Sequence, residues 1–476
     1  MPWVDDAPTV GSVEESLKPE ELALALRDLH AWAIAHAPAE ESALRVRIRE
    51  LLGVDPAELP VVSRQIPLWE RANLQVALDA YLGSDERWHE FIGLSAQRGW
   101  HMGLAELAQR PTSGGAWVAF GPQAGPQEHV TVQVGERTIV CVAAGLFLIR
   151  DGEEPFVVAI RGGDPHSGEP DVVVEAMGRE REHLERFLEE IVRLMGVHNV
   201  YRGRVLEVGG GEWGGPSFDV RALPTVDRDG IVLPDGVLER VERHALTFGA
   251  EADRLRDAGR HIKRGLLLYG PPGTGKTLTA MYLANRMPDR TVLILTGSGL
   301  AAIGPACQMA RALTPSMVVM EDVDLVALDR DEYSSNALLF ELLNEMDGMQ
   351  EDIDVVFLLT TNRPDRLEPA LASRPGRVDM AVELPLPDAA ARRRLIALYS
   401  QGLEVRAQNL AELIEQTEGA SPAFIRELLR RAALFAIESG DGDVVVDESH
   451  LLAALAELGS DAGPLTGKLL GLQRPD

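Results

Sequence analysis

The chain's 476 residues exceed what one hydrophobic core accommodates and predict about two to four domains. Acidic residues outnumber basic ones by 74 to 46, for a net charge of −28. This charge repels phosphate backbones and argues against nucleic acid as the main partner, although a local basic pore would escape the argument. No window approaches about 18 unbroken apolar residues, so no membrane span is expected.

Residues 1–110 are expected to form a helical N-terminal domain. Apolar residues recur at helical spacing after Pro19, a residue type suited to the first turn of a helix. Further helices are expected over 40–52, 67–82, 85–95 and 102–109. Nothing in this region resembles a catalytic site, so an adaptor or substrate-recognition role is the favoured interpretation.

A linker at 111–115 precedes a predicted α+β domain over residues 112–208. Its strands are expected over 117–120, 130–134, 138–142, 146–149, 156–160 and 171–175. An amphipathic helix follows over 179–195, and a last strand over 201–208 is expected to close this domain. The glycine-rich stretch 209–225 is predicted to be a flexible linker.

Residues 226–387 predict an α/β domain. Helical stretches alternate with expected strands over 265–269, 291–296, 316–320, 355–360 and 380–384. This alternation is typical of a parallel sheet with helices on both faces, which binds ligands at the carboxyl ends of its strands. A helical lid over 388–460 and a tail over 461–476 complete the chain.

The strand expected at 265–269 leads into the loop GPPGTGKT (270–277), which is followed by a helix. This is the context that the phosphate-binding motif G-x-x-x-x-G-K-T requires. Backbone N–H groups are expected to surround the β-phosphate, with Lys276 on the β- and γ-phosphates and the Thr277 hydroxyl on Mg²⁺. The predicted nucleotide-binding residues are Gly270, Pro271, Pro272, Gly273, Thr274, Gly275, Lys276, Thr277 and Leu278.

Lysine is rare in this chain. Only Lys18, Lys263, Lys276 and Lys468 are lysines among the 46 basic residues. A lysine kept at position 276 indicates that a compact ammonium is needed there rather than a planar guanidinium.

Polar residues follow two other expected strands. The apolar run 316–320 ends at Glu321 and Asp322, and adjacent carboxylates beside a phosphate loop can hold Mg²⁺ and polarise the attacking water. Glu321 is therefore predicted, with Thr277, to be a metal ligand. Asn362 follows the next strand and could position water, although Asn-Arg-Pro alone is typical of a turn.

Arg374 and Arg377 flank a proline-glycine turn, which is expected to present both side chains outward. An arginine supplied by a neighbouring subunit can stabilise the charge of phosphoryl transfer. In so arginine-rich a chain, a surface pair would be the simpler interpretation without the other motifs.

The motifs GPPGTGKT, PSMVVMEDVD, LLNEMDG (342–348), TTNRPDRLEPAL (360–371) and RPGRVD (374–379) together resemble the AAA family of ATPases, in its order and at about its spacings. The resemblance covers residues 225–460. It implies a ring, usually a hexamer, with ATP at subunit interfaces.

Matched by position, the resemblance implies that Glu321 and Asp322 form the second acidic motif and that Asn362 is sensor 1. It also implies that Arg374 and Arg377 act in trans on a neighbour. In the lid, Gly419 and Ala420 look like the adenine-side contact, and Arg426 is a weak candidate for sensor 2.

Two departures from the family pattern bear on function. Most members have Asp-Glu where this chain has Glu321-Asp322, an inversion that resembles the mitochondrial Rieske-protein translocase branch. Because Asp322 is one methylene shorter than Glu, its reach to the catalytic water is reduced and modest turnover is expected. The first pore loop of protein-threading members carries aromatic-aliphatic-glycine, whereas this chain has Ala302-Ile303-Gly304, which argues against threading.

The leading hypothesis is an ATP-hydrolysing ring that uses ATP and Mg²⁺ and remodels or disassembles a protein partner recognised by residues 1–220. A slowly hydrolysing, nucleotide-gated scaffold or switch is the alternative, and a nucleic-acid motor is a third class. Cys141 and Cys307 lack metal-binding spacing, which fits a reducing cytoplasm. The arginine-, alanine- and glycine-rich composition is typical of a GC-rich bacterial genome.

Overall fold

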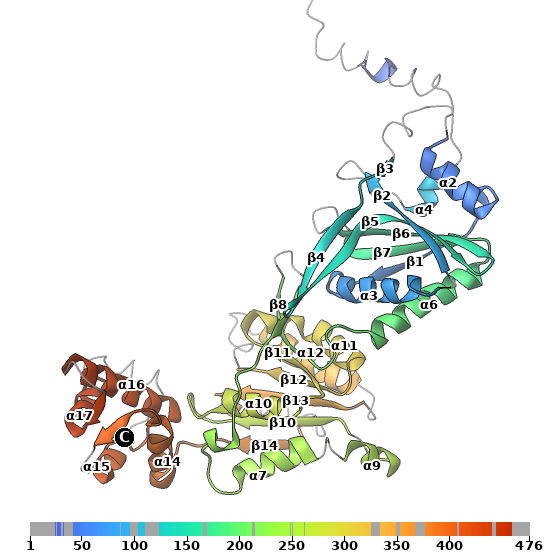
Figure 1. Ribbon diagram of the computed structural model, residues 1–476. Helices are drawn as coiled ribbons and strands as arrows, with labels where there is room; N and C mark the ends of the chain where they lie inside the picture. The colour runs from blue at the N-terminus through green and yellow to red at the C-terminus, as the bar shows by residue number, and fades with distance from the viewer. Residues whose placement is uncertain are drawn as a thin grey trace, which may run out of the picture. The chain divides into compact units, whose positions relative to one another are not determined.

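Strand pairing divides the described chain between two seven-stranded sheets and one two-stranded sheet (Figure 1). A computed structural model describes residues 24, 26–29, 32, 41–85, 87–95, 103–109, 123–164, 169–211, 215–247, 249, 251–260, 262–324, 334–348, 353–365, 367, 377–406, 409–439 and 444–458. Over these residues, no helix combines the length and apolar character needed to cross a membrane.

The first unit comprises Met1–Val132 and Ile139–His198. The pairs β1–β7, β7–β6, β6–β5, β5–β2 and β2–β3 of its sheet are all antiparallel, and β4 also pairs with β5. The strands are β1 (Val61–Ile66), β2 (Arg87–Ser95), β3 (Gln123–Gly125), β4 (Glu128–Val134), β5 (Arg137–Asp151), β6 (Glu154–Asp164) and β7 (Glu169–Gly178). The helices are α2 (Ala43–Leu52), α3 (Arg71–Leu82), α4 (Leu104–Leu107) and α6 (Arg181–Val197), with short helical turns η1 (Pro56–Glu58) and η2 (Leu68–Glu70).

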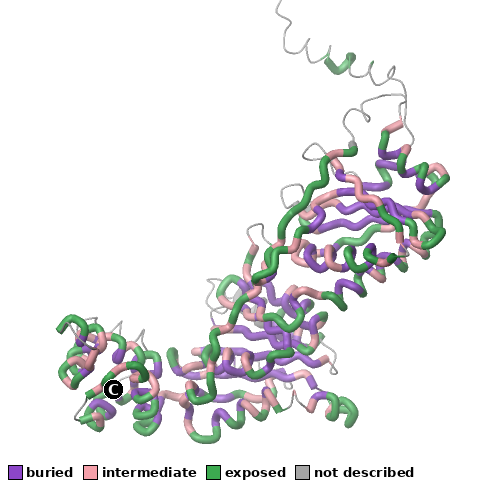
Figure 2. The backbone as a smooth tube through the Cα atoms, viewed as in Figure 1, coloured by how far each residue is buried: buried purple, intermediate pink, exposed green. Residues whose placement is uncertain are grey.

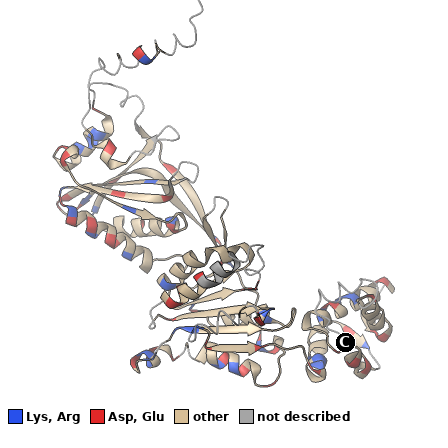
Figure 3. Cartoon of the chain, turned by 180° about the vertical axis from the view of Figure 1, so that it is seen from behind, with Lys and Arg blue, Asp and Glu red and all other residues tan. Residues whose placement is uncertain are grey.

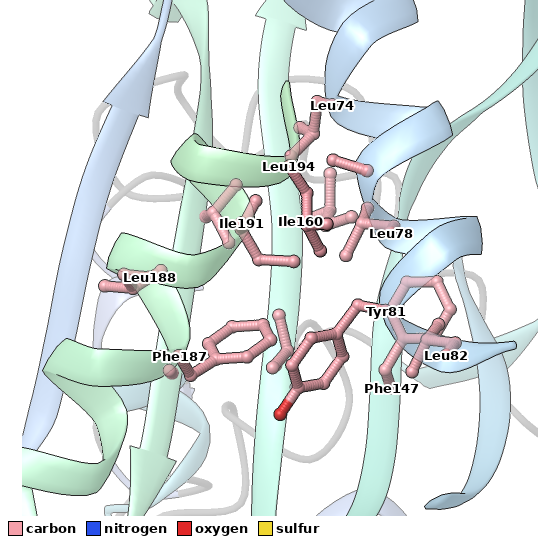
Figure 4. Packing of buried hydrophobic residues seen from close by; sticks show 14 of the residues in the cluster. Leu74, Leu78, Tyr81, Leu82, Phe147, Ile160, Phe187, Leu188, Ile191 and Leu194 are labelled. Carbon is pink, nitrogen blue, oxygen red and sulfur yellow. The ribbon is translucent and has the colours of Figure 1, made fainter. Parts of the chain in front are cut away.

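Helices cover both faces of this sheet. Because successive side chains of a strand point to opposite faces, those of the central strands pack into two different cores. Phe147 and Ile160 face α3 and α6, where Tyr81 and Phe187 meet edge to face with ring centroids 5.1 Å apart (Figure 4). The intervening residues, such as Leu146 and Leu148 on β5 and Val157 and Ala159 on β6, pack with α2 and α4.

The expectation of a purely helical domain over residues 1–110 is wrong. The segments 61–66 and 87–95 are strands of the same sheet as β5–β7, so a domain boundary near residue 110 would divide one sheet. The helix expected at 85–95 is β2, where pairing with β5 outweighs the apparent helical spacing. The helices expected over 40–52 and 67–82 are confirmed as α2 and α3. The linker at 111–115, the strand at 117–120 and the tail 461–476 lie outside the described residues.

The second unit comprises Gln133–Thr138 and Asn199–Asp476. Its large sheet has the order β14-β10-β13-β12-β11-β8-β9 and is parallel except for the β8–β9 pair. Its strands are β8 (Val205–Gly210), β9 (Pro216–Arg221), β10 (Arg264–Tyr269), β11 (Thr291–Leu295), β12 (Ser316–Met320), β13 (Val355–Thr361) and β14 (Met380–Glu383). The helices of this part are α7 (Val237–Glu242), α9 (Ala252–Asp257), α10 (Lys276–Asn285), α11 (Ile303–Ala312) and α12 (Ser334–Gly348), with the 3-10 helices η4 (Arg228–Gly230) and η6 (Gly297–Ala302) and the π-helix η5 (Arg243–Thr247).

The parallel α/β sheet predicted from the alternation of strands and helices is confirmed. Every residue of β12 and β13 is buried, as expected for central strands with both faces covered (Figure 2). Helix α10 packs on one face, where Tyr282 and Leu283 join residues of β10, β12 and β13 in one core.

The strand expected at 201–208 to close the preceding domain belongs instead to this second sheet. β8 pairs with β11 in parallel through Val205–Val208, and β9 returns antiparallel beside β8. The stretch 209–225 is therefore not simply a linker, since β9 lies within it. The alternating burial of β8, with Leu206 and Val208 buried, suits an outer strand of a covered sheet.

A helical lid follows the large sheet. It consists of α14 (Ala389–Tyr399), α15 (Leu410–Gln416), α16 (Pro422–Ser439) and α17 (Glu448–Ala456), with a small parallel sheet of β15 (Glu404–Arg406) and β16 (Val445–Asp447). The four helices match the sequence-based expectation, whereas the three-residue strands were too short to be found. Phe424 and Leu428 of α16 lie in the centre of the lid core.

Candidate functional site

The phosphate loop joins the end of β10 to the start of α10. Three of its glycines have positive φ angles: 144° at Gly270, 76° at Gly273 and 97° at Gly275. A Cβ atom at Gly270 would lie 2.2 Å from the backbone oxygen of Leu384, so the close approach of the chain just after β14 also requires glycine there. The backbone thus has the curled form that a phosphate-binding loop needs.

Lys276 opens α10 and its side chain is buried against the loop. Its Nζ donates hydrogen bonds of 2.9 Å to the carbonyl oxygens of both Gly270 and Pro271. Burial lowers the pKa of Lys276, while the negative charges of Asp322 and Asp324 oppose that shift. The ammonium therefore lies in a desolvated site where its attraction to a polyphosphate is stronger than at the surface.

Glu321 directly follows β12 and lies next to the phosphate loop. Burial raises the pKa of the Glu321 carboxyl group, a hydrogen bond with the Thr277 side chain opposes the rise, and the charge of Asp322 adds to it. A hydroxyl and a carboxylate in contact at this point are the oxygen donors that a Mg²⁺ ion bound to ATP uses. Thr277 and Glu321 thus fit the predicted metal role.

Asp322 adopts a left-handed backbone conformation, with φ of 48°, which is uncommon for a residue other than glycine. Its backbone N–H donates to the Thr360 hydroxyl at 3.0 Å, and its Oδ1 accepts a 2.9 Å hydrogen bond from Nδ2 of Asn362. Strained backbone held by neighbouring hydrogen bonds is common at functional sites.

Asp324 forms hydrogen bonds at the carboxyl end of β13, where Asn362 lies. Its Oδ1 accepts hydrogen bonds from the Thr361 hydroxyl at 2.8 Å and from the Asn362 backbone N–H at 3.1 Å. The Asp324 side chain is buried, so these bonds satisfy a charge that would otherwise be costly. The position of Asn362 is therefore fixed through both its backbone and its side chain.

A cavity of about 710 Å³ lies over the phosphate loop, a volume within the usual range of small-molecule sites. It brings Lys276, Thr277, Asp322 and Asn362 together at one end. The remaining walls come from the segment before α7 and from the lid. They include Gly230, Ile231, Val232, Leu233, Leu395, Tyr399, Pro422, Ala423, Arg426, Glu427 and Arg430.

The lid contacts the phosphate loop directly. The Ala423 N–H donates to the Gly273 carbonyl oxygen at 3.3 Å. Gly419, with φ of 75°, and the fully buried Ala420 do not line the cavity, but they form the turn into α16, whose first residues do. Of the residues carried over by resemblance in the lid, Arg426 is the one that lines the cavity.

The expectation that Arg377 points outward is wrong. Its side chain is only 7% exposed and forms an ion pair with Asp347 at the end of α12. The backbone around it packs against β10, since a Cβ at Gly265 would lie 1.9 Å from the Arg377 oxygen. Arg374 lies outside the described residues.

Sequence reasoning missed the wall formed by residues 230–233 and the supporting role of Asp324. The segment 230–233 carries no recognisable sequence motif. It contributes to the cavity only because the folded chain brings it close to the phosphate loop. The role of Asp324 was detectable: a third acid two residues after Asp322, at the end of a buried strand, indicates a carboxylate held inside the site.

Comparison with known proteins agrees with this geometry. Residues 266–386 match the family described as "ATPase family associated with various cellular activities (AAA)". The matched stretch contains Lys276, Glu321, Asp322 and Asn362.

Three curated relatives illustrate the similarity. The chain is 37% identical over 207 residues to ATPase family gene 2 protein homolog A of Homo sapiens, covering 40% of this chain and 23% of that protein. It is 31% identical over 259 residues to the proteasome-activating nucleotidase of Thermococcus onnurineus, covering 51% and 64%. It is 36% identical over 190 residues to 26S proteasome regulatory subunit 8 of Caenorhabditis elegans, covering 37% and 45%.

In each of these three alignments the chain spans less than two thirds of the relative's own length. The likeness therefore concerns the nucleotide-binding part. The loop geometry, the two acids, the asparagine and the family match all point to the same conclusion. Residues 266–386 form an ATPase domain of the AAA family.

Proposed function

We propose that this protein is a cytoplasmic, ring-forming AAA ATPase that binds and hydrolyses ATP and uses the energy to remodel or disassemble a protein partner recognised by residues 1–220. The observation that carries the proposal is the cavity that holds Lys276, Thr277, Asp322 and Asn362 at one end. The free, buried Cys141 and Cys307 are consistent with a reducing compartment.

The roles of the residues follow from their positions. Lys276 binds the phosphates, and Thr277 and Glu321 would hold Mg²⁺, which neutralises charge that develops on the phosphate oxygens. Asp322, whose Oδ1 accepts a hydrogen bond from Asn362, would orient water and accept its proton. Because Asp322 is shorter than the glutamate common at this position, we expect slow turnover.

A ring would complete the site with arginine from a neighbouring copy, and Arg374 is the better candidate for this role. Arg377 is already paired with Asp347 inside its own chain. A mixture of two inactive variants, Lys276→Ala and Arg374→Ala, tests the arrangement. In a mixed ring, a Lys276→Ala subunit can supply its Arg374 to the intact phosphate loop of an Arg374→Ala subunit, and activity should reappear. A mixture that is as inactive as its two components would exclude a shared site.

The position of the first pore loop supports work without threading. Ala302 ends η6, Ile303 begins α11, and both side chains are buried. No aromatic or aliphatic side chain is thus offered to a polypeptide from this stretch. This observation favours local remodelling over threading. It agrees equally with the alternative, a slowly hydrolysing nucleotide-gated scaffold or switch.

Charge gives no support to the third class, a nucleic-acid motor. Acidic and basic residues are interspersed along the described helices, and the strands are largely uncharged (Figure 3). A nucleic-acid channel would need clustered basic residues. Salt-dependent binding to DNA would revive this class.

A steady-state ATPase assay of the wild type, Lys276→Ala and Asp322→Asn tests the proposed function. We expect measurable wild-type turnover that both substitutions abolish. Turnover that is equal in all three proteins would contradict the enzyme. Nucleotide-dependent assembly without turnover would favour the scaffold, and capture of a protein by ATP-loaded Asp322→Asn would identify the partner.

A further inference from the structure

One wall of the cavity is a short extended segment, residues 231–233, whose side chains alternate between two cores. Ile231 and Leu233 are buried with α7 and α10, whereas Val232 packs against the core of the lid. All three residues of this segment line the cavity. Its placement therefore determines how much room a nucleotide base has between the large sheet and the lid.

Arg228 anchors the segment just before it reaches the cavity. Its guanidinium donates to Glu239 at 2.7 Å and to both oxygens of Glu242 at 3.0 and 3.1 Å. Glu239 and Glu242 lie one turn apart on α7. Three hydrogen bonds to two carboxylates hold the turn η4 against α7 more firmly than a single exposed pair would.

Glu242 extends this anchor to the phosphate helix. Its Oε1 also accepts a hydrogen bond from the hydroxyl of Tyr282, which is 1% exposed and belongs to α10. A second link lies one turn further, where Nδ2 of Asn285 donates to the Pro224 carbonyl oxygen at 2.8 Å. Lys276 and Thr277 are the first residues of this same helix.

We propose that Arg228, Glu242 and Tyr282 are positioning residues for the base end of the nucleotide. They fix the segment 231–233 relative to α10 and so set the distance between the base-binding wall and the phosphate-binding loop. The inference rests on the proposed function, because it requires that ATP occupies this cavity. None of the three residues is among those that line the cavity, so they act through the segment rather than by touching ATP.

The expected effect is moderate and confined to the base. The Arg228 and Glu239 side chains are about half exposed, at 46% and 53%, so water screens their attraction. Loss of the network should therefore weaken ATP binding only by about threefold to tenfold. Binding of the phosphate chain alone should not change, since the loop does not depend on the network.

Calorimetric titration of the full chain with magnesium ATP and, separately, magnesium tripolyphosphate tests this. Arg228→Gln removes the anchor, and Tyr282→Phe removes one hydroxyl while keeping the buried ring. The matched control is Arg254→Gln, which breaks an exposed pair with Glu251 of 2.7 Å in the same unit. We expect weaker ATP binding in the first two variants, unchanged tripolyphosphate binding in all, and partial recovery in Arg228→Lys.

Steady-state kinetics gives a second readout, in which KM for ATP rises and kcat at saturating ATP stays constant. Equal weakening of ATP and tripolyphosphate would show a general structural effect and overturn the proposal, as would no change in either. If Tyr282→Phe fails to fold, the surface variant Arg228→Gln still decides the question. A wild-type protein that binds neither ligand would instead contradict the proposed function.

Discussion

The side-chain amide of Asn362 donates a 2.9 Å hydrogen bond to Oδ1 of Asp322. Asn362 follows β13 and Asp322 follows β12, so adjacent parallel strands deliver both groups to one edge of the sheet. The bond occupies Oδ1, and among the described residues no hydrogen bond to Oδ2 competes with a water molecule. The proposed sensor residue and the proposed catalytic acid are thereby joined before any substrate arrives.

Replacing Asp322 with Asn should lower turnover by about 10²–10⁴, the usual loss when a general base is removed. ATP binding should persist, because asparagine tolerates the positive φ of 48° and no phosphate contact is lost. Parallel measurements of kcat and of ATP affinity check this. The control is Asp253→Asn, a change at an exposed acid, and a comparable loss there would remove the argument for Asp322.

Asp324→Asn should destabilise the protein by about 1–3 kcal/mol, because the two hydrogen bonds that Oδ1 accepts lose their charge assistance and the NH2 group that replaces Oδ2 adds donors in a buried position. Asn362 should lose its fixed position, so kcat should fall more than ATP affinity does. Urea unfolding and steady-state kinetics measure the two effects. Unchanged stability would mean that the buried charge is not held as described.

Gly273→Ala should separate the lid from the phosphate loop. The added Cβ would lie 2.8 Å from the Ser421 hydroxyl and 3.0 Å from the Ala423 Cβ. The matched control is Gly402→Ala, which has a similarly positive φ of 85° but meets nothing within 4 Å. ATP affinity, measured by titration, should fall for the first variant and not for the second, and equal losses would indicate a remote effect of backbone strain.

Both cysteines should resist alkylation in the native protein. Burial raises the pKa of the Cys307 thiol to about 12 and also raises that of Cys141. The reactive thiolate is therefore scarce as well as shielded at neutral pH. Titration with a thiol reagent should detect neither group until a denaturant is added, and rapid native labelling of Cys307 would contradict its burial.

The lid should lose stability in acid through Glu427. Hydrogen bonding with Arg430, and then with Arg431, lowers its pKa from 4.5 to about 2. Because the folded pKa is depressed, this contribution is present above pH 4.5 and is lost as the pH falls toward 2. The Arg430 side chain is 70% exposed, so we expect only about 0.5–1 kcal/mol.

Thermal unfolding of wild type and Glu427→Gln checks this titration. The variant should be less stable than the wild type at neutral pH, and the difference should shrink as the acid group is protonated. Glu404→Gln is the control, since Glu404 pairs with an exposed arginine on the short strand β15. A difference that stays constant with pH would contradict the assignment to Glu427.

The nucleotide site could be predicted from sequence because its chemistry is carried by local motifs. The loop from Gly270 to Thr277 has to follow a strand and begin a helix, so its sequence defines its surroundings. Glu321, Asp322 and Asn362 end apolar runs, and parallel strands bring such ends together. The apolar runs and the polar residues that end them therefore located these residues at one edge of the sheet.

The first unit could not be predicted in the same way. The segment 87–95 becomes a strand through seven residue pairs with β5, a partner more than fifty positions away, and nothing in its own spacing encodes that partner. β8 shows the same limit, because its pairing with β11 assigns it to the second sheet. The orientation of Arg377 was also inaccessible, since Asp347 meets it only in the folded chain.

The ion pair between Arg377 and Asp347 has a consequence for assembly. In an isolated subunit, Asp347 neutralises the charge of Arg377. This ion pair would have to break before Arg377 could pair with a second molecule. To serve a neighbour's ATP, Arg377 would have to exchange one anion for another. Only an interface that offers a stronger counter-ion than Asp347 would release it, and a loosely formed contact between copies would leave the neighbouring site without its charge.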